Sequence, residues 1–342
     1  MKTDSVQYKT LKNRLPGVLL VMALALFLAN AASLPCSTAQ ASDPDIKYCV
    51  KDMSDRSVCL NTRSPKIISL SPGSTELLFA AGAGDRVIAV DQHSDFPEAV
   101  KKLPNVGGYP NVNIEAIVAM KPDLVVVWTA GNSQKIIRQL ESIGISTFHI
   151  DVVDFAGIER AIRSLGQVAG TEKEAGRVVD EFSTRLKALQ SNYGQREPVS
   201  VFFEIWRSPL MTVGNEQVID DVISLCGGQN IYGDVSERVP EIGIESLISR
   251  NPQVIIGSDP RGDTPETRKD LMNYWSQWEN LQAVRKQQLF SVPSDVIARP
   301  TPRMLDGAEM ICRQLQAVRT GSGSSRSDYM AAQTSLHEES QF

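Results

Sequence analysis

The first half of the chain alternates short apolar runs with longer amphipathic segments. Four runs are short and rich in apolar and β-branched residues, which predicts strands: PKIISLS (65–71), DRVIAVD (85–91), PDLVVVW (122–128) and STFHID (146–151). The segments between them place apolar residues at helical spacing. Because the strands are almost continuously apolar and alternate with helices, the pattern predicts a parallel sheet that is covered on both faces.

The same alternation begins again near residue 200. Strands are predicted at SVFFEIW (200–206), PQVIIGS (252–258) and QLFSVP (288–293), and the last helix at PRMLDGAEMICRQLQAVR (302–319). Two separate stretches of alternating strands and helices indicate two α/β units.

Residues 171–193, TEKEAGRVVDEFSTRLKALQSNY, differ from both units. The segment is long, charged and free of proline. Its apolar residues form one stripe at helical spacing: Val178, Val179, Phe182, Leu186 and Leu189. A helix of about 23 residues spans roughly 34 Å, the length of a domain. The pattern therefore allows either a buried helix of one domain or a strut between two domains.

The predicted fold class is α/β, with two Rossmann-like lobes whose sheets are mainly parallel and which are joined by a single long α-helix. A polar, Ser- and Gly-rich segment follows the last helix, a composition that does not support a packed core. The expected organisation is a signal peptide (1–41), an N-terminal lobe (42–170), a connecting helix (171–195), a C-terminal lobe (196–319) and a disordered tail (320–342).

One phrase occurs twice, once in each predicted lobe. Residues 114–127 read IEAIVAMKPDLVVV, and residues 244–257 read IESLISRNPQVIIG. Each is interpreted as a helix that starts at Ile-Glu, a proline that stops it, and an apolar strand. Only the isoleucine, the glutamate and the proline are identical, so Glu115 and Glu245 occupy the same place in the two copies.

The first 41 residues are typical of a secretory signal peptide. Basic residues precede the apolar run GVLLVMALALFLA (17–29), and Ala39-Gln40-Ala41 fits a cleavage site, with Ala29-Asn30-Ala31 as a second candidate. A membrane anchor is the alternative, although the run is shorter than the ~20 residues that a span needs. Cys36 would permit lipid attachment, but the preceding Leu34-Pro35 makes a poor lipobox.

Four cysteines remain once the signal peptide is removed: Cys49, Cys59, Cys226 and Cys312. An even number in an exported protein suggests two disulfides. Cys49 and Cys59 flank KDMSDRSV, which favours a staple across a hairpin and leaves Cys226 to pair with Cys312. The alternative for the second pair is two buried free thiols.

Charge and motifs exclude several function classes. A net charge of −5 argues against nucleic acid as the main partner. The chain contains no GxxxxGK[ST], GxSxG, HExxH or CxxC motif, and GAGDRV (82–87) has Val87 where a dinucleotide loop needs its third glycine. Outside the tail only His93 and His149 remain, too few for a dedicated metal site. No nucleophile–base pair stands out, so neither catalytic residues nor an enzymatic activity are expected.

Several strings together resemble a known family. They are ISLSPGSTELLFAAGAGDRVIAVDQHSDFP, NVGGYPNVNIEAIVAMKPDLVVVW, CGGQNI, IESLISRNPQVII and TPRM. They resemble the substrate-binding proteins of bacterial ABC importers for iron-siderophore, haem and cobalamin, and within that family the cobalamin binders, over residues 65–317. The resemblance implies two α/β lobes joined by one long helix, with a ligand in the cleft between them. It also implies a monomeric periplasmic protein that delivers its ligand to a permease dimer in the inner membrane without a resident cofactor.

The resemblance gives the repeated glutamates a role. In the family, one acidic residue on each lobe docks onto arginines of the two permease subunits, and Glu115 and Glu245 match those positions. A symmetric dimer offers two like basic pockets, which suits a duplicated acid. The simpler alternative is that a glutamate in the first turn of a helix is favoured by the helix dipole.

The resemblance also implies a set of ligand contacts for cobalamin or a related corrinoid. Tyr109 falls where the cobalamin binders have a contacting aromatic residue, His93 where they have a tyrosine, and Met211 where they have a phenylalanine. The contact loop of the C-terminal lobe corresponds to Asp295, Val296, Ile297, Ala298 and Arg299. The implied pair Cys226–Cys312 also matches a family disulfide.

The sequence departs from the cobalamin binders at two places. The loop DVIARP (295–300) lacks the family's aromatic pair, and Val239 stands where a tryptophan is expected. We expect Trp206 and Tyr232 to replace the lost stacking area. A ferric siderophore or haem remains the alternative ligand, for which the candidate basic residues are Arg207, Arg238, Arg299 and Arg303.

Overall fold

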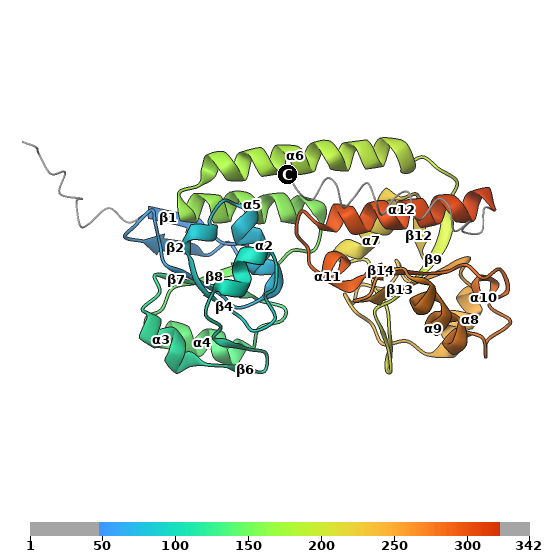
Figure 1. Ribbon diagram of the computed structural model, residues 1–342, viewed down its shortest axis with the longest axis horizontal. Helices are drawn as coiled ribbons and strands as arrows, with labels where there is room; N and C mark the ends of the chain where they lie inside the picture. Colours follow the sequence, from blue (N-terminus) through green and yellow to red (C-terminus); the bar gives the residue numbers. More distant parts are fainter. Residues whose placement is uncertain (1–47, 322–342) are drawn as a thin grey trace, which may run out of the picture. The chain divides into compact units, whose positions relative to one another are not determined.

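The computed structural model describes residues 48–321, and its framework is two four-stranded sheets (Figure 1). The sheet of the N-terminal lobe has the order β4-β3-β7-β8, and that of the C-terminal lobe β12-β9-β13-β14. Every neighbouring pair within these sheets is parallel. In chain order both sheets therefore run second, first, third, fourth. The strands are β3 (Ile67–Ser69), β4 (Val87–Val90), β7 (Leu124–Trp128), β8 (Thr147–Ile150), β9 (Val199–Glu204), β12 (Gly228–Asn230), β13 (Val254–Asp259) and β14 (Leu289–Pro293).

Each sheet is flanked by helices on both faces, as the apolar runs predict. In β7, Leu124 and Val126 join one buried cluster, whereas Val125 and Val127 join another. The helices of the N-terminal lobe are α2 (Pro72–Ala80), α3 (Ile114–Met120), α4 (Gln134–Ser142) and α5 (Phe155–Ala169). Those of the C-terminal lobe are α7 (Val218–Leu225), α8 (Ile244–Arg250), α9 (Pro265–Trp275), α10 (Gln282–Arg285), α11 (Ser294–Ile297) and α12 (Met304–Thr320). The predicted α/β fold with two parallel sheets is confirmed.

Short elements complete the lobes. Three two-stranded hairpins and two 3₁₀ turns occur in the described residues: β1 (Tyr48–Lys51) with β2 (Ser57–Leu60), β5 (Gly107–Gly108) with β6 (Asn111–Val112), β10 (Trp206–Arg207) with β11 (Leu210–Met211), η1 (Gly84–Arg86) and η2 (Glu98–Lys102). The start of α2 is Ser71, whose hydroxyl accepts from the Ser74 amide, while Pro72 occupies the first turn. A proline is favoured there because its fixed φ suits a helix start.

The long helix α6 (Glu172–Tyr193) runs unbroken over 22 residues. It packs against α5 of the N-terminal lobe and against α7 and α12 of the C-terminal lobe (Figure 1). Val179, Phe182 and Leu189 are buried, and Val178 and Leu186 are partly buried against the same core cluster, which contains residues of both lobes. The helix therefore connects the two lobes, and its apolar face is also part of a core that both lobes share.

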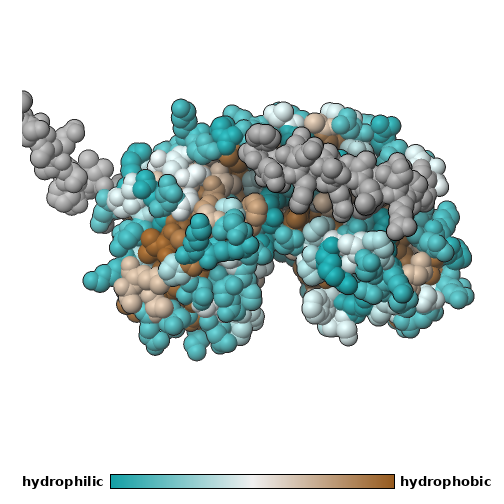
Figure 2. Space-filling view, in the orientation of Figure 1, coloured by the Kyte–Doolittle hydropathy of each residue, from teal (hydrophilic) through white to brown (hydrophobic). Residues whose placement is uncertain are grey.

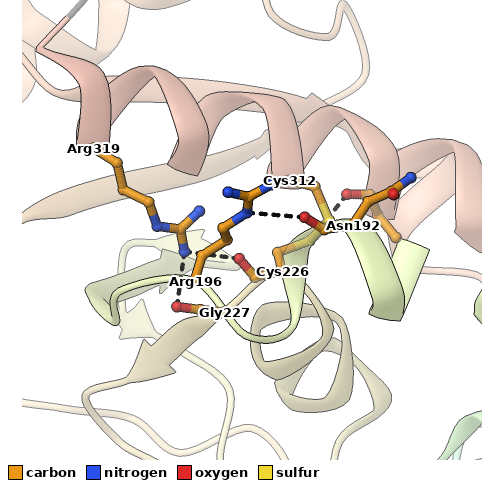
Figure 3. Close-up of a disulfide and its surroundings, with 7 residues drawn as sticks. Asn192, Arg196, Cys226, Gly227, Cys312 and Arg319 are labelled. Carbon is orange, nitrogen blue, oxygen red and sulfur yellow. Dashed lines mark hydrogen bonds between the residues drawn. A yellow bond between two sulfur atoms is a disulfide. The ribbon is translucent and has the colours of Figure 1, made fainter. Parts of the chain in front are cut away.

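Two disulfides are present, and they join the expected pairs. Cys49 and Cys59 are directly opposite each other in the β1–β2 hairpin. Cys226 at the end of α7 is bonded to Cys312 in α12, and both are fully buried. Figure 3 shows Arg319 of the same helix reaching the carbonyl oxygens of Cys226 and Gly227, both at 2.9 Å. The second disulfide thus lies in a region where α12 is anchored to the turn that follows α7.

Two sequence expectations concern parts outside the described residues. The signal peptide (1–41) and residues 322–342 of the predicted tail are among them. Between residues 48 and 321, no helix has the length and apolar character that a membrane span requires.

Candidate functional site

The loops that leave the carboxyl ends of the two sheets form the candidate site. In open parallel sheets, ligands bind in the crevice beside these ends. Figure 2 shows a hollow between the two lobes. Two sets of ion pairs cross from one lobe to the other, and we call the space bordered by these loops and ion pairs the interlobe cleft. One set is centred on Glu76 and the other on Asp151.

Glu76 of α2 is 4% exposed and accepts hydrogen bonds from three residues of the C-terminal lobe. Its carboxylate oxygens lie 2.9 Å from Arg299 Nη1, 2.9 Å from Thr301 Oγ1 and 3.1 Å from Arg303 Nε. A buried carboxylate is tolerated when its acceptor sites are filled in this way. Glu76 belongs to the string STEL, and Thr301 and Arg303 belong to TPRM, so two strings of the family pattern meet at this junction.

Arg299 and Arg303 have further contacts at the same junction. Arg299 Nη1 also lies 2.6 Å from Asp95 Oδ1. Burial of Asp95 opposes its ionisation, but the hydrogen bond and charge of Arg299 outweigh this and hold the pKa of Asp95 below its usual range. The Arg303 guanidinium stacks on the ring of Phe96, 3.9 Å from its centroid.

The other two arginines proposed for an anionic ligand are paired as well. Arg238 of the C-terminal lobe makes a two-pronged contact with Asp151, which follows β8, at 2.8 and 2.9 Å. Arg207 lies 2.6 Å from Glu204 at the end of β9. An anionic ligand would have to compete with a carboxylate at each of these positions.

Two of the predicted contacts in the N-terminal lobe are neighbours. Tyr109 is 66% exposed at the tip of the β5–β6 hairpin. A Cβ atom on Gly108 would lie 3.3 Å from Cδ2 of His93, so the histidine loop packs against this hairpin. Buried Asp91 holds that loop by accepting from the backbone amide of His93 and the hydroxyl of Ser94.

Met211 of the C-terminal lobe lies in the β10–β11 hairpin, directly opposite Trp206. Trp206 is 62% exposed, and its indole nitrogen donates to the carbonyl oxygen of Ser208 at 2.9 Å. The hairpin leaves the carboxyl end of β9 and presents the flat ring at the edge where a ligand is expected.

The loop of residues 295–299 is only partly available to a ligand. Ala298 is exposed, and Asp295 and Val296 are half-buried. Ile297 is fully buried and packs beside Gly307 of α12, so its side chain is not available to a ligand in this structure. The reason is that residues 294–297 form the short helix α11, which turns this side chain into the core.

Tyr232 does not supply stacking area. Its side chain is 1% exposed and packs against Phe202, and its hydroxyl lies 3.2 Å from Ser246 Oγ. The expectation that it faces a ligand is therefore wrong.

Two exposed aromatic residues were absent from the predicted contacts. Phe96 is 40% exposed, and Trp128, the last residue of β7, is 44% exposed. Gly131 leaves room for the indole, since a Cβ atom there would lie 2.0 Å from the Trp128 ring. A strand-ending tryptophan at the carboxyl edge of a parallel sheet is the signal that could have identified it.

The repeated phrase forms the same structure twice. Helices α3 and α8 each have seven residues, and each ends at a non-glycine residue with positive φ, 47° at Lys121 and 42° at Asn251. Strands β7 and β13 follow. Glu115 and Glu245 are exposed in the first turns, and within residues 48–321 neither carboxylate has a hydrogen-bond or ion-pair partner.

His149 belongs to a different place, beneath the β1–β2 hairpin. Burial and the nearby Arg56 lower the pKa of its imidazole despite the attraction of Asp52 and Glu141. Arg56 itself bonds both Asp52 and Glu141. No cluster of three or more His, Cys, Asp or Glu residues is placed to hold a metal ion in the described part of the chain.

Comparison with known proteins places this architecture in a family. The periplasmic binding protein family matches residues 67–296. The vitamin B12-binding protein of Vibrio campbellii is 34% identical over 262 residues, which cover 76% of this chain and 92% of that protein. The vitamin B12-binding protein of Yersinia pestis is 33% identical over 259 residues, which cover 75% of this chain and 88% of the relative.

Solved structures agree. The periplasmic vitamin B12-binding protein BtuF of Vibrio cholerae is 31% identical with a TM-score of 0.67, covering 75% of this chain and 98% of that one. The haem-binding protein RhuT of Roseiflexus sp. RS-1 is 22% identical with a TM-score of 0.65, covering 75% and 99%, a likeness of fold alone. By sequence, coverage and fold, the chain is a member of the periplasmic binding protein family.

Proposed function

We propose that this protein is the periplasmic substrate-binding component of an ABC importer, and that it captures cobalamin or a related corrinoid in the interlobe cleft. Its role is binding and delivery, without covalent chemistry. Support comes from the relatives, because proteins described as vitamin B12-binding are 33–34% identical over about three quarters of the chain.

The observation that carries the ligand proposal is a pair of exposed aromatic rings on opposite lobes. Tyr109 and Trp206 are 66% and 62% exposed, and each lies on a hairpin beside the carboxyl edge of its sheet. Exposed rings of this size suit the faces of a large flat ligand, since aromatic side chains contribute extensive apolar area with a few polar atoms. The proposed contacts around them are His93, Met211 and the 295–299 loop without the Ile297 side chain.

A ferric siderophore or haem is the alternative ligand. The arginines that would recognise its carboxylates or catecholates are all engaged with carboxylates of the protein. A ligand that takes one of these arginines leaves the protein's own carboxylate unpaired, which costs free energy in a partly buried site. This favours the corrinoid, whose periphery is largely amide.

A ligand panel tests the proposal. Cyanocobalamin, cobinamide, haem and a ferric hydroxamate siderophore are titrated into the mature protein and followed by absorbance and calorimetry. We expect cyanocobalamin or cobinamide to bind with a Kd in the nanomolar to low micromolar range. Corrinoid binding weaker than tens of micromolar beside tight haem or siderophore binding would overturn the ligand assignment.

The second part of the proposal concerns delivery. Glu115 and Glu245 are proposed to accept hydrogen bonds from basic residues of the two permease subunits, one on each lobe, because both carboxylates are exposed and without partners in the described chain. The double variant Glu115→Gln/Glu245→Gln should reduce cyanocobalamin uptake and leave the Kd for cyanocobalamin unchanged. A loss of ligand affinity would instead place these residues at the ligand.

A further inference from the structure

We infer that each docking face has two parts, the glutamate and an exposed aliphatic side chain three residues later. These side chains are Val118 on α3 and Ile248 on α8. Each fits an apolar recess next to the basic group in one half of a twofold-symmetric membrane partner. The inference rests on the proposed docking of Glu115 and Glu245 and adds the residues that would exclude water from those contacts.

The exposure of these two residues is unusual for this chain. Val118 is 46% exposed and Ile248 is 39% exposed. Seven large hydrophobic residues are exposed in the described part of the chain, and four are aromatic: Phe96, Tyr109, Trp128 and Trp206. Of the three that are aliphatic, two occupy the same position of a repeated unit, and the third is Ile143. A single exposed aliphatic residue needs no explanation, but a repeated one does.

The two helices present the acid and the aliphatic residue in the same way. Residues three apart lie on the same side of a helix, so Glu115 is next to Val118 and Glu245 is next to Ile248. The intervening side chains that face inward, Ile117 and Leu247, are both 0% exposed. The inward residue fixes the rotation of each short helix, and this rotation sets the outward pair.

The chemistry of this pair defines the partner. An unpaired carboxylate calls for a cation, and an adjacent apolar side chain removes water from that contact when the surfaces meet. Charge pairs gain strength as water is excluded, and apolar contacts around a central polar pair are a common arrangement in interfaces. Two copies on two lobes of the same topology fit a partner that repeats one basic and apolar site about a twofold axis.

The basic residue at the end of α8 does not compete for Glu245. Arg250, at the end of α8, is occupied by Asp234 at 2.7 and 3.0 Å and stacks over Tyr232 at 4.4 Å. Its guanidinium is therefore directed away from Glu245 and toward the loop after β12. At the corresponding position α3 has Met120, which is uncharged and half-buried.

The experiment measures how the mature protein binds right-side-out inner-membrane vesicles from the bacterium that produces it, with cyanocobalamin present. Three serine variants are made: Val118→Ser, Ile248→Ser and the double variant Val118→Ser/Ile248→Ser. Each is compared with the variant Glu115→Gln/Glu245→Gln. The matched control is Ile143→Ser, which removes the third exposed aliphatic residue of the described chain, in the loop between α4 and β8. Calorimetry with cyanocobalamin is run on every variant.

We expect each serine variant to weaken vesicle binding about tenfold and the double variant about a hundredfold, because an aliphatic side chain of this size loses its burial in the complex. Ile143→Ser and all ligand affinities should match the wild type. If the serine variants bind normally while the glutamine variant does not, this inference is wrong and glutamate docking stands. If neither set loses binding, both are wrong. A loss for Ile143→Ser as large as for Val118→Ser would also overturn the inference.

Discussion

The two lobes share a topology and differ in where their aromatic residues lie. In the N-terminal lobe Phe96, Tyr109 and Trp128 are exposed, whereas in the C-terminal lobe Trp206 is exposed and Trp275 is fully buried. The buried ring stacks edge-on against Phe202 at 5.8 Å and donates its indole N–H to Glu204 at 2.7 Å. The same sheet order therefore accommodates three exposed aromatic rings in one lobe and a fully buried tryptophan in the other.

This difference shows that the order of the strands and the orientation of the aromatic side chains have separate causes. The order of strands follows from the alternation of apolar runs and helices, which is alike in both lobes. The outward or inward direction of an aromatic ring follows from local contacts at the ends of strands. Glu204 illustrates this, because one oxygen binds Trp275 and the other binds Arg207, which stacks over Tyr274.

The largest expected effect is the loss in free energy of unfolding when a disulfide is removed. Each lobe contains one disulfide, and the two losses should differ. Cys226–Cys312 closes a separation of 86 residues, and Cys49–Cys59 closes one of 10. Chain entropy predicts losses of about 4–5 kcal/mol for Cys226→Ala/Cys312→Ala and about 3 kcal/mol for Cys49→Ala/Cys59→Ala in the free energy of unfolding. Urea denaturation measures both. Equal losses would show that hairpin geometry, rather than loop length, decides the contribution.

The next effect concerns the junction between the lobes. Glu76→Ala removes the carboxylate that Arg299, Thr301 and Arg303 share, and it should lower the free energy of unfolding by about 3–5 kcal/mol because the guanidinium groups lose a buried partner. The matched control is Glu98→Ala, an exposed glutamate paired with Lys101, which should change the free energy by under about 1 kcal/mol. Similar values for the two variants would contradict a junction role for Glu76.

Ligand affinity separates the surface aromatics from the core ones. Tyr109→Ala and Trp206→Ala should each weaken cyanocobalamin binding by about 1–2 kcal/mol, roughly five- to thirtyfold, because each removes an exposed ring that we propose to contact the ligand. Tyr232→Phe serves as the control, since that hydroxyl bonds Ser246 inside the C-terminal lobe. Calorimetry decides the matter, and a Tyr232→Phe protein with weakened affinity would reverse our placement of that residue.

The smallest expected effect is a dependence of stability on pH that arises from His149 in the N-terminal lobe. The pKa of His149 is lowered from 6.5 in the folded protein, so below about pH 6.5 the unfolded chain binds more protons. The stability that this residue contributes is present above that pH and declines as the pH falls toward the folded pKa. The lowered pKa of Glu141 acts in a separate window, below about 4.5.

Melting temperatures of the wild type and His149→Asn, measured from pH 7.5 to 5.5, test this response. The wild type should lose stability over this interval, and the variant should lose less. Parallel curves for the two proteins would assign the response to other groups.

The sequence predicts the fold well because apolar periodicity is a local property. Seven of the eight strands in the two sheets were predicted within two residues of their observed bounds, and α6 begins one residue after the predicted start, but β12 was not predicted. The errors lie at element ends, as in β9, which was predicted at 200–206 and runs from Val199 to Glu204. Boundary errors of this kind leave the topology unchanged.

The site is less predictable because its contacts join distant residues. Glu76 and Arg299 are 223 positions apart, and nothing near either residue in the sequence indicates the other. The arginines therefore resembled free cations, although each is paired. Tyr232 resembled a surface aromatic because its burial depends on how β9 places Phe202.

The continuous hydrophobic cluster beneath α6 has a consequence for how the molecule can be divided. Residues of α2 and α5 from one lobe and of α7 and α12 from the other bury their apolar side chains in the same cluster as Val179 and Phe182. Cutting the polypeptide on either side of α6 would expose an apolar surface of each fragment to water. Neither fragment should be obtainable as a soluble product by itself, and heating should melt the intact protein in a single cooperative transition.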